Sequence, residues 1–382
     1  MTVHLSRCVF AVVFLATLSL TFLATADSLE PSKSLSPTTM PEPKTVTLPA
    51  QRLPLSQALA ELMKQTGIHV EDSRGASAET IPVEWNRTPF WQALDALAAT
   101  SKARVNLYPT SGRIVLDKRG ANYRLPPIGY DGRFRLSVKK VTASRDLEIN
   151  EKDERGGATH FALEIAWDPE LLPLYLETRP RGLRWRDDRN NAGTLADEGS
   201  SLAPVDGLIA LGIDLHLPSF PRSVASLRSL EGELSMIGPS KMLTFTFDRL
   251  DRLAKSKTND PERQLRQENV ACRILDVKLL RDRWTVRVAL DYPPGMKQLD
   301  SNQSWVVNNE MTLESLDGKK RVAGTNYGFN SATSQHAVLS YHFRDRGLVG
   351  RGKPEAWRVR YRTPANLIEV PIKFAFHDVP LP

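Results

Sequence analysis

Hydrophobic and polar positions alternate along most of this chain, with two different periods. Between residues 45 and 118, short alternating segments lead into stretches where apolar residues recur at helical spacing. From residue 130 onward the period is two, interrupted by polar loops, and helical spacing is nearly absent. The pattern predicts an α+β domain at residues 45–118 followed by regions built mainly from antiparallel β-strands.

The predicted α+β domain contains an internal repeat, because residues 45–70 recur 35 residues later as residues 80–105. In each copy a strand leads through a proline into an amphipathic helix. Solenoids need about three or more repeats, usually helix pairs, so two copies predict one compact domain with two helices on a small sheet. The identical positions are Thr45 and Thr80, Arg52 and Arg87, Pro54 and Pro89, Gln57 and Gln92, Ala58 and Ala93, Leu59 and Leu94, Leu62 and Leu97, and Val70 and Val105.

This domain resembles the secretin and TonB short N-terminal (STN) domain. The resemblance rests on the segments Val46–Leu48, Leu53–Leu59, Thr66–Ile68, Pro89–Leu94 and Ile114–Leu116. In that family the module is a noncatalytic protein-contact domain of the periplasm that precedes secretin pores or TonB-dependent receptors. The resemblance therefore implies an envelope protein partner. The pore and receptor roles do not carry over, since the downstream pattern lacks the strands of a barrel.

The remainder of the chain resembles uncharacterised exported bacterial proteins with β-sandwich domains, and this likeness implies no functional residue. The spacing predicts two immunoglobulin-like sandwiches, at residues 130–248 and 269–382. Phe161–Trp167 is a representative strand of the first, and Val370–Phe376 is predicted to close the second. Residues 249–268 are predicted to be a charged connector that divides the two sandwiches.

The first 26 residues have the order of a secretory signal peptide. An apolar run from Cys8 to Leu23 follows a basic start and precedes the small residues Ala24–Ala26. Removal after residue 26 is expected, and an uncleaved membrane anchor is the alternative. Residues 27–44 are rich in Ser, Thr, Pro and Glu, which predicts a flexible linker. We therefore expect an exported protein of the periplasm or cell surface, with no membrane span after the signal is removed.

Net charge and cysteine content limit the kinds of partner and of covalent bond that the chain can have. The chain carries 51 Lys and Arg against 44 Asp and Glu, a formal net charge of +7. This mild excess suggests a preference for anionic surroundings but does not indicate a nucleic-acid partner. Cys272 is the one cysteine outside the predicted signal, so no disulfide within the mature chain is expected, and its apolar neighbours predict a buried, inert thiol.

Catalytic and metal-binding motifs are incomplete. Gly347–Lys353 resembles a phosphate-binding loop, but Pro354 stands where the motif needs a Ser or Thr hydroxyl. The nucleophile elbow of serine hydrolases is missing. No histidine pair has metalloprotease spacing, although a metal site assembled across strands stays open. The sequence predicts a noncatalytic protein without a cofactor; a hydrolase with a site between the sandwiches is the weaker alternative.

Two clusters of basic and aromatic residues remain as candidates for ligand contact. Arginine rows can engage anionic polymers, and stacking on tryptophan suits sugars; solvated strand faces are the alternative. Carbohydrate or anionic-polymer binding is therefore the second hypothesis, after docking of a protein partner through the STN-like domain with the sandwiches as spacer or second surface. The candidate residues are Arg181, Arg184, Trp185, Arg186, Arg358, Arg360 and Arg362.

Overall fold

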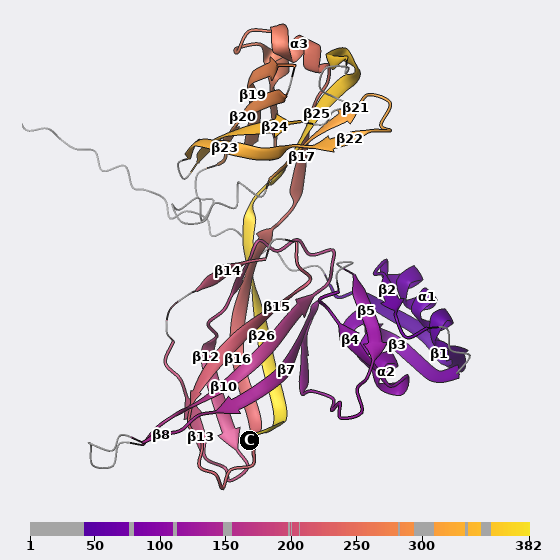
Figure 1. Cartoon of the computed structure of the whole chain (residues 1–382), viewed down its shortest axis with the longest axis vertical. Helices are drawn as coiled ribbons and strands as arrows, with labels where there is room; N and C mark the ends of the chain where they lie inside the picture. Colours follow the sequence, from indigo (N-terminus) through magenta and orange to yellow (C-terminus); the bar gives the residue numbers. More distant parts are fainter. Residues whose placement is uncertain are drawn as a thin grey trace, which may run out of the picture. The chain divides into compact units, whose positions relative to one another are not determined.

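The structure is a computed structural model that is mostly β-sheet (Figure 1). This confirms the β-rich class expected from the strand periodicity. The predicted signal peptide at residues 1–26 and most of the predicted linker at 27–44 lie outside the described residues. No helix in the described part of the chain is both long and apolar enough to cross a membrane. The residues described are 42–75, 80–109, 113–147, 155–197, 199, 201–205, 207–281, 283–293, 309–332, 335–344 and 353–382.

Residues 45–118, called the N-terminal module below, contain two helices and two small sheets, whereas the sequence pattern predicted a single small sheet. The duplication does not show that strands of the two units pair in separate sheets. The first sheet pairs β1 with β3 antiparallel, and in the second β5 lies between β2 and β4. Each helix directly follows a strand that ends in proline, so the repeat in the sequence corresponds to two β-α-β units. The elements are β1 (Thr45–Pro54), α1 (Leu55–Thr66), β2 (Val70–Asp72), β3 (Thr80–Pro89), α2 (Phe90–Thr100), β4 (Ala103–Asn106) and β5 (Ile114–Lys118).

The core of the N-terminal module is shared with the strands that follow it. Leu62 of α1 and Leu94 of α2 are fully buried within it, as the amphipathic pattern predicts. Ala166 and Ala210, which lie far along the chain, complete the same core. Gly67 ends α1 with φ 74°, a left-handed conformation that glycine adopts without strain. The module is therefore not closed by its own residues alone.

The next strands form two sheets around a second core, called the first sandwich below. One sheet has the order β15-β10-β7-β6, and the other has the order β13-β12-β16-β11-β14 with β26 paired to β16. A separate two-stranded sheet joins β8 (Asp146–Leu147) and β9 (Arg155–Gly156). The elements are β6 (Ile128–Asp131), β7 (Phe134–Ala143), β10 (Ala158–Trp167), β11 (Tyr175–Glu177), β12 (Arg181–Asp187), β13 (Ala192–Thr194), β14 (Leu202–Pro204), β15 (Ala210–Pro218), β16 (Ser226–Pro239) and β26 (Leu367–Pro380).

A third core lies between two further sheets, called the second sandwich below. Their orders are β17-β25-β21-β22 and β18-β19-β20-β24-β23. Leu250 and Leu253 of α3 are buried in this core. The elements are β17 (Met242–Phe247), α3 (Leu250–Lys255), the 3-10 turn η1 (Pro261–Arg263), β18 (Gln264–Gln267), β19 (Val270–Leu279), β20 (Trp284–Asp291), β21 (Glu310–Ser315), β22 (Arg321–Ala323), β23 (Thr325–Ala332), β24 (His336–Phe343), the 3-10 turn η3 (Pro354–Ala356) and β25 (Trp357–Pro364).

The predicted boundaries of the two sandwiches are wrong at three places. The strand expected to close the region 269–382 is β26, which instead pairs with β16 along its length and packs in the first core (Figure 1). β17, assigned by sequence to 130–248, pairs with β25 of the second sandwich. The predicted connector 249–268 is part of that sandwich rather than a divider. Alternation shows that a strand has one buried face, but it does not show which sheet the strand joins.

Two short links join the sandwiches, because the second is inserted between β16 and β26. Ser240–Lys241 lead from β16 into β17, and Ala365–Asn366 lead from β25 into β26. The links bond to each other: Ser240 N donates to Asn366 O (2.8 Å) and Ala365 N donates to Lys241 O (2.8 Å). Hydrogen bonding between strands therefore continues through the connection.

Asp117 at the end of β5 provides a pH-dependent test of the N-terminal module. Its carboxylate accepts hydrogen bonds from Ser73 Oγ (2.7 Å) and Asn106 Nδ2 (2.8 Å). The Ser73 bond, with help from Asn106 and Arg104, lowers the pKa of Asp117 below its usual value. A lowered folded-state pKa stabilises the protein above the unfolded value, about 3.9, and this stabilisation disappears as pH falls through the folded value.

We therefore expect Asp117→Asn to lower the free energy of unfolding at pH 7, and the difference from wild type to shrink as pH falls below about 4. Urea unfolding measured at several pH values tests this. Ser73→Ala, which removes the bond with the largest effect, should reproduce part of the same pH dependence. A difference that stays constant from pH 7 to about pH 3 would contradict it.

Candidate functional site

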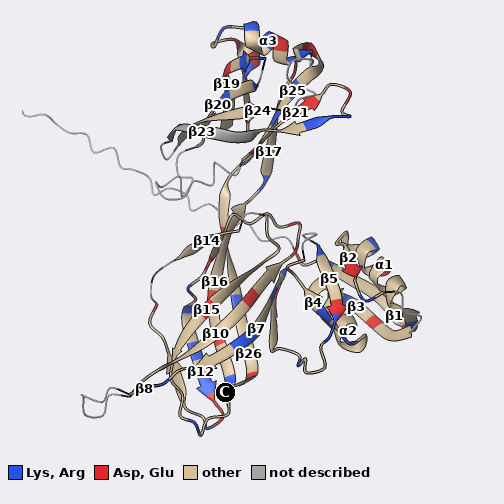
Figure 2. Ribbon diagram, viewed as in Figure 1, with Lys and Arg blue, Asp and Glu red and all other residues tan. Residues whose placement is uncertain are grey.

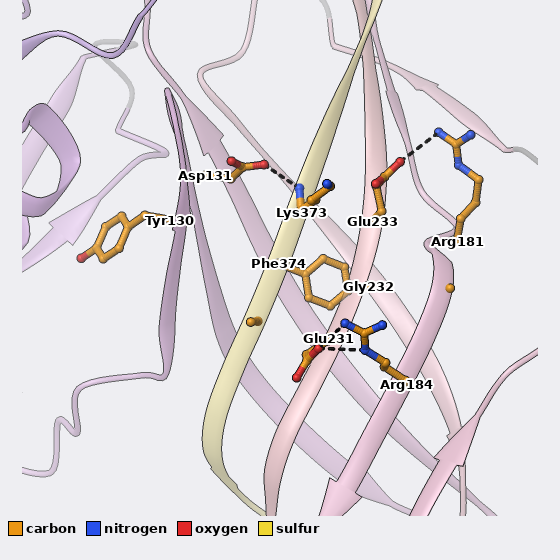
Figure 3. A pocket seen from close by; sticks show the side chains of 11 residues that line it. Tyr130, Asp131, Arg181, Arg184, Glu231, Gly232, Glu233, Lys373 and Phe374 are labelled. Carbon is orange, nitrogen blue, oxygen red and sulfur yellow. Dashed lines mark hydrogen bonds and ion pairs between the residues drawn. The ribbon is translucent and has the colours of Figure 1, made fainter.

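The first cluster of candidate arginines borders a shallow groove on one sheet of the first sandwich. Arg181 and Arg184 come from β12, Glu231 and Glu233 from β16, and Lys373 from β26 (Figure 3). The groove has a volume of about 540 Å³ and also reaches Tyr130 and Asp131 at the end of β6. Side chains of both charges thus line it, although the sequence drew attention only to the basic ones.

Arg181 lies among carboxylates. Its guanidinium is 3.1 Å from Glu369, 3.6 Å from Glu177 and 4.0 Å from Glu233. The guanidinium also donates to Ser235 Oγ (2.6 Å), and this hydroxyl donates to the buried Glu177 (2.6 Å). The charge of Arg181 is therefore offset within the protein.

Arg184 is paired in the same way. Its Nε donates to Glu231 Oε2 at 2.8 Å, and its NH2 group lies 2.7 Å from the same oxygen (Figure 3). Both residues belong to the β12–β16 ladder, where Arg184 is opposite Glu231. Cross-strand placement of opposite charges is the usual way in which a solvated sheet face is stabilised.

Trp185 and Arg186 do not join the groove residues. Trp185 is half-buried, and its ring packs edge-on against Phe220, with centroids 4.9 Å apart. Gly193 lies directly opposite, and a Cβ there would come within 2.2 Å of the indole. The indole of Trp185 therefore packs on the sheet. Sugar binding requires an aromatic ring whose face is exposed, so Trp185 is not placed for that role. Arg186 is exposed on the same strand, opposite Ser229.

The second cluster forms a row on β25, as the alternation predicted. Arg362 pairs with Glu310 (3.1 Å), Arg360 with Glu314 (2.9 Å), and Arg358 lies 3.5 Å from an Asp248 carboxylate oxygen. The hydrogen bond from Arg360, with further attraction from Arg321, holds the pKa of Glu314 below its usual range.

The structure keeps the two arginine clusters on different sandwiches and pairs most of their members with carboxylates. An anionic polymer would have to displace or compete with these partners, so the geometry weakens the polymer-binding hypothesis. What the groove of Figure 3 offers is a polar surface with alternating charge. Exposed pairs of this kind contribute only about 0–1 kcal/mol each, so the like charge of the lining carboxylates, more than the strength of the pairs, disfavours an anionic polymer.

Sequence reasoning missed a buried ionic network between α2 and the first sandwich. Arg135 of β7 donates to Asp95 of α2 through Nε (2.7 Å) and NH2 (3.0 Å), and it lies 3.5 Å from Glu164 of β10. Tyr130 also donates to Asp95 (2.7 Å). Arg135 alternates with the apolar Phe134 and Leu136, so alternation alone would place it on the solvent face, yet the packing of α2 over this face buries it. No local signal in the sequence reveals that burial.

Electrostatics keep Arg135 charged. Burial lowers the pKa of Arg135, but the carboxylates of Asp95 and Glu164 raise it by more, so the guanidinium remains protonated. Burial and the nearby Asp95 charge raise the pKa of the Tyr130 phenol well above its usual range. The phenol therefore acts as a hydrogen-bond donor, which indicates a structural rather than an acid–base role.

A second connection lies beside the first. The indole Nε1 of Trp91 in α2 donates to the backbone oxygen of Arg133 (3.1 Å), and the Arg133 guanidinium bonds to the buried Asp168 carboxylate (2.6 Å). Lys44, just before β1, pairs with Glu170. The N-terminal module is thus attached to the first sandwich by buried, directional contacts.

The other chemical candidates remain without a site. In the described ranges no three or more His, Cys, Asp or Glu side chains gather in a way that could hold a metal ion. Cys272 is buried as predicted, and burial raises the pKa of its thiol well above the usual range. Residues 347–352 of the phosphate-loop-like segment lie outside the described residues.

Comparisons with known proteins do not identify a family. No protein-family model matches the chain, and no curated protein matches it. One solved structure that aligns with it is the atomic model of the Salmonella SPI-1 type III secretion injectisome basal body proteins InvG, PrgH and PrgK. The identity is 9%, the alignment covers 86% of this chain and 92% of that chain, and the TM-score is 0.17. A TM-score this low supports no conclusion about fold or function.

Proposed function

We propose that this chain is a noncatalytic, exported protein of the bacterial envelope that docks a protein partner through its STN-like N-terminal module. The observation that supports the proposal is the way the module is held. One side is attached to the first sandwich through the buried Arg135–Asp95 ion pair and the hydrogen bond from Trp91, whereas one face of α1 remains exposed. A module presented in this manner is suited to binding a partner and not to enclosing a substrate.

The buried attachment uses α2, and the C-terminal end of α1 joins it through Lys44, which donates to Thr66 O (2.6 Å) and pairs with Glu170. Asp95 and Trp91 of α2 make the contacts to Arg135 and to the backbone of Arg133. Buried ion pairs of this kind favour one arrangement, because any other arrangement would leave a desolvated charge without a partner. The exposed face of α1 is therefore presented by a module that is not free to rotate about a loose linker.

The exposed face of α1 has few charges. Ser56, Ala60 and Met63 lie at helical spacing along it, beside the exposed Gln57, Lys64 and Gln65, and Met63 is 41% exposed. The α1 ribbon is mostly tan in Figure 2, the colour of uncharged residues. Glu61 and Lys64, the only charged residues of α1, pair with each other at 3.3 Å. A smooth, weakly charged helix face with an adaptable methionine is typical of surfaces that bind another helix or an apolar patch.

In the same proposal the sandwiches, which we infer to be immunoglobulin-like, act as a spacer with a second contact surface in the groove of Figure 3. The two hydrogen-bonded links between them support the spacer role, because paired strands resist bending more than a single linker does.

Partner capture from an envelope fraction tests the proposal. Because Ala166 and Ala210 complete the core of the module, the experiment uses the whole mature chain. We expect one specific envelope protein to be retained, and Ala60→Glu with Met63→Glu to weaken its retention by about tenfold or more, as charge placed in a contact centre does.

Ala96→Glu with Ala99→Glu is the matched control, since it adds the same two charges to exposed positions of α2. It should leave retention unchanged. Retention of the same partner by wild type and by the Ala60/Met63 double variant alike would exclude α1 as the docking face. Failure of the wild-type chain to retain any specific protein would count against the proposed function as a whole.

A further inference from the structure

Two histidines meet on the outer face of the β15-β10-β7-β6 sheet. His160 of β10 and His216 of β15 are directly opposite each other in the antiparallel register. Their rings are in edge-to-face contact with centroids 4.5 Å apart and planes at 86°. His216 is exposed and His160 is half-buried, so both rings are open to solvent on one side. The function proposed above makes no use of this pair.

The pair has the chemistry of a metal chelate. Residues directly opposite in an antiparallel ladder have Cβ atoms about 4.5–5.5 Å apart. At that separation, rotation of two imidazoles about their side-chain bonds can bring one nitrogen of each to about 2.0–2.1 Å from a shared ion. The two strands therefore position the ligands in advance, and only the ring orientations need to change.

Solvent reaches the pair from the outer face of the sheet, since His216 is exposed and His160 is half-buried. A hollow of about 450 Å³ at the edge of β15 borders His216 and Asp214 but not His160. Ala162, the residue opposite Asp214, is small and adds no obstruction. On β7, Thr142 is opposite His160 and Lys140 is opposite Ala162. Asp214 and Lys140 carry charges of opposite sign, so their effects on a nearby cation offset each other. The affinity for a metal ion would therefore come from the imidazole nitrogens.

We propose that His160 and His216 bind one divalent transition-metal ion of the zinc, nickel or copper class. Two imidazole nitrogens are the protein ligands, and water fills the other coordination positions, in keeping with the lack of a group of three or more metal-ligating side chains in the described part of the chain. Imidazole favours these metals, whereas magnesium and calcium prefer oxygen ligands. The site is independent of the docking face on α1.

Metal titration of the untagged mature chain tests the proposal. We expect Ni²⁺ to bind by calorimetry, and bound Cu²⁺ to give an electron paramagnetic resonance spectrum with coupling to two nitrogens. His160→Asn and His216→Asn should each weaken Ni²⁺ binding by about tenfold or more, since a tenfold change needs only about 1.4 kcal/mol. Mg²⁺ should not compete.

His377→Asn is the control, because this exposed histidine lies on β26, in the other sheet of the same sandwich. It should bind Ni²⁺ as wild type does. Thermal unfolding in chelator shows that each variant is folded before metal is added. No Ni²⁺ binding at about 1 mM, or equal affinity in wild type and both histidine variants, would overturn the proposal.

Discussion

Replacing Arg135 with alanine is expected to lower the free energy of unfolding by about 3–5 kcal/mol, the usual effect of breaking a buried ion pair on one side. The side chain of Arg135 is 5% exposed, and those of its partners Glu164 and Asp95 are 6% and 13% exposed. Without the guanidinium, both carboxylates would lose a cationic partner while remaining desolvated, although Asp95 would keep its hydrogen bond from Tyr130 and Glu164 its pair with Lys139. Urea unfolding of the mature chain measures the loss.

A matched control is Lys64→Ala, which breaks the exposed pair with Glu61. Its effect should be within about 0.5 kcal/mol of zero, as for most surface substitutions. The apolar replacement of all three charges, with Arg135→Met, Asp95→Leu and Glu164→Leu, should recover part of the stability, since it leaves no buried charge unpaired. A loss below about 1 kcal/mol in Arg135→Ala would show that this network is hydrated.

Phe376→Ala is expected to destabilise the first sandwich by about 3–5 kcal/mol while leaving the second largely intact. Phe376 lies on the last strand, β26, and is fully buried in the core shared with β10 and β16. A cavity there removes packing from the first sandwich, although position along the chain would assign it to the second. Hydrogen exchange measured by mass spectrometry distinguishes destabilisation of the first sandwich from destabilisation of the second.

In Phe376→Ala, amides of β10 and β16 should lose protection while those of β20 and β24 retain theirs. Phe343→Ala supplies the mirror experiment, because Phe343 is fully buried in the core of the second sandwich. In Phe343→Ala, amides of β20 and β24 should lose protection while those of β10 and β16 retain theirs. Loss of protection in β20 and β24 on substitution of Phe376 would contradict the assignment of β26 to the first sandwich.

The N-terminal module shows which structural features local sequence patterns can predict. Leucines at helical spacing predicted α1 and α2, and both helices are present with Leu62 and Leu94 buried. Alternation predicted β10 and β25 with the correct buried faces. These features depend on which face of one element is apolar, and a single stretch of sequence contains that information.

The candidate ligand residues show what such patterns cannot predict, namely the partners of each charged side chain. Arg358, Arg360 and Arg362 do lie along one strand face, as their spacing predicted. The partners of Arg360 and Arg362 are Glu314 and Glu310 on β21, which are 46 and 52 residues away in the chain, and Arg358 pairs with Asp248, 110 residues away. The sequence did not connect them. The same holds for Arg181, whose partners include Glu369. The spacing of charged residues along a strand predicts the face on which they lie. Whether each charge is paired depends on the residues of the neighbouring strand.

By itself, then, the sequence determined the β-rich class, the duplicated unit and the faces of individual strands, because each depends on residues that are close in the chain. The tertiary structure alone decided that β26 returns to the first sandwich, that Arg135 is buried under α2, and that His160 lies opposite His216. These pairings join residues as far apart in the chain as Ser226 and Pro380, which are separated by 154 positions. The chain's periodicity permits many such pairings, and only the packing of complete cores selects among them.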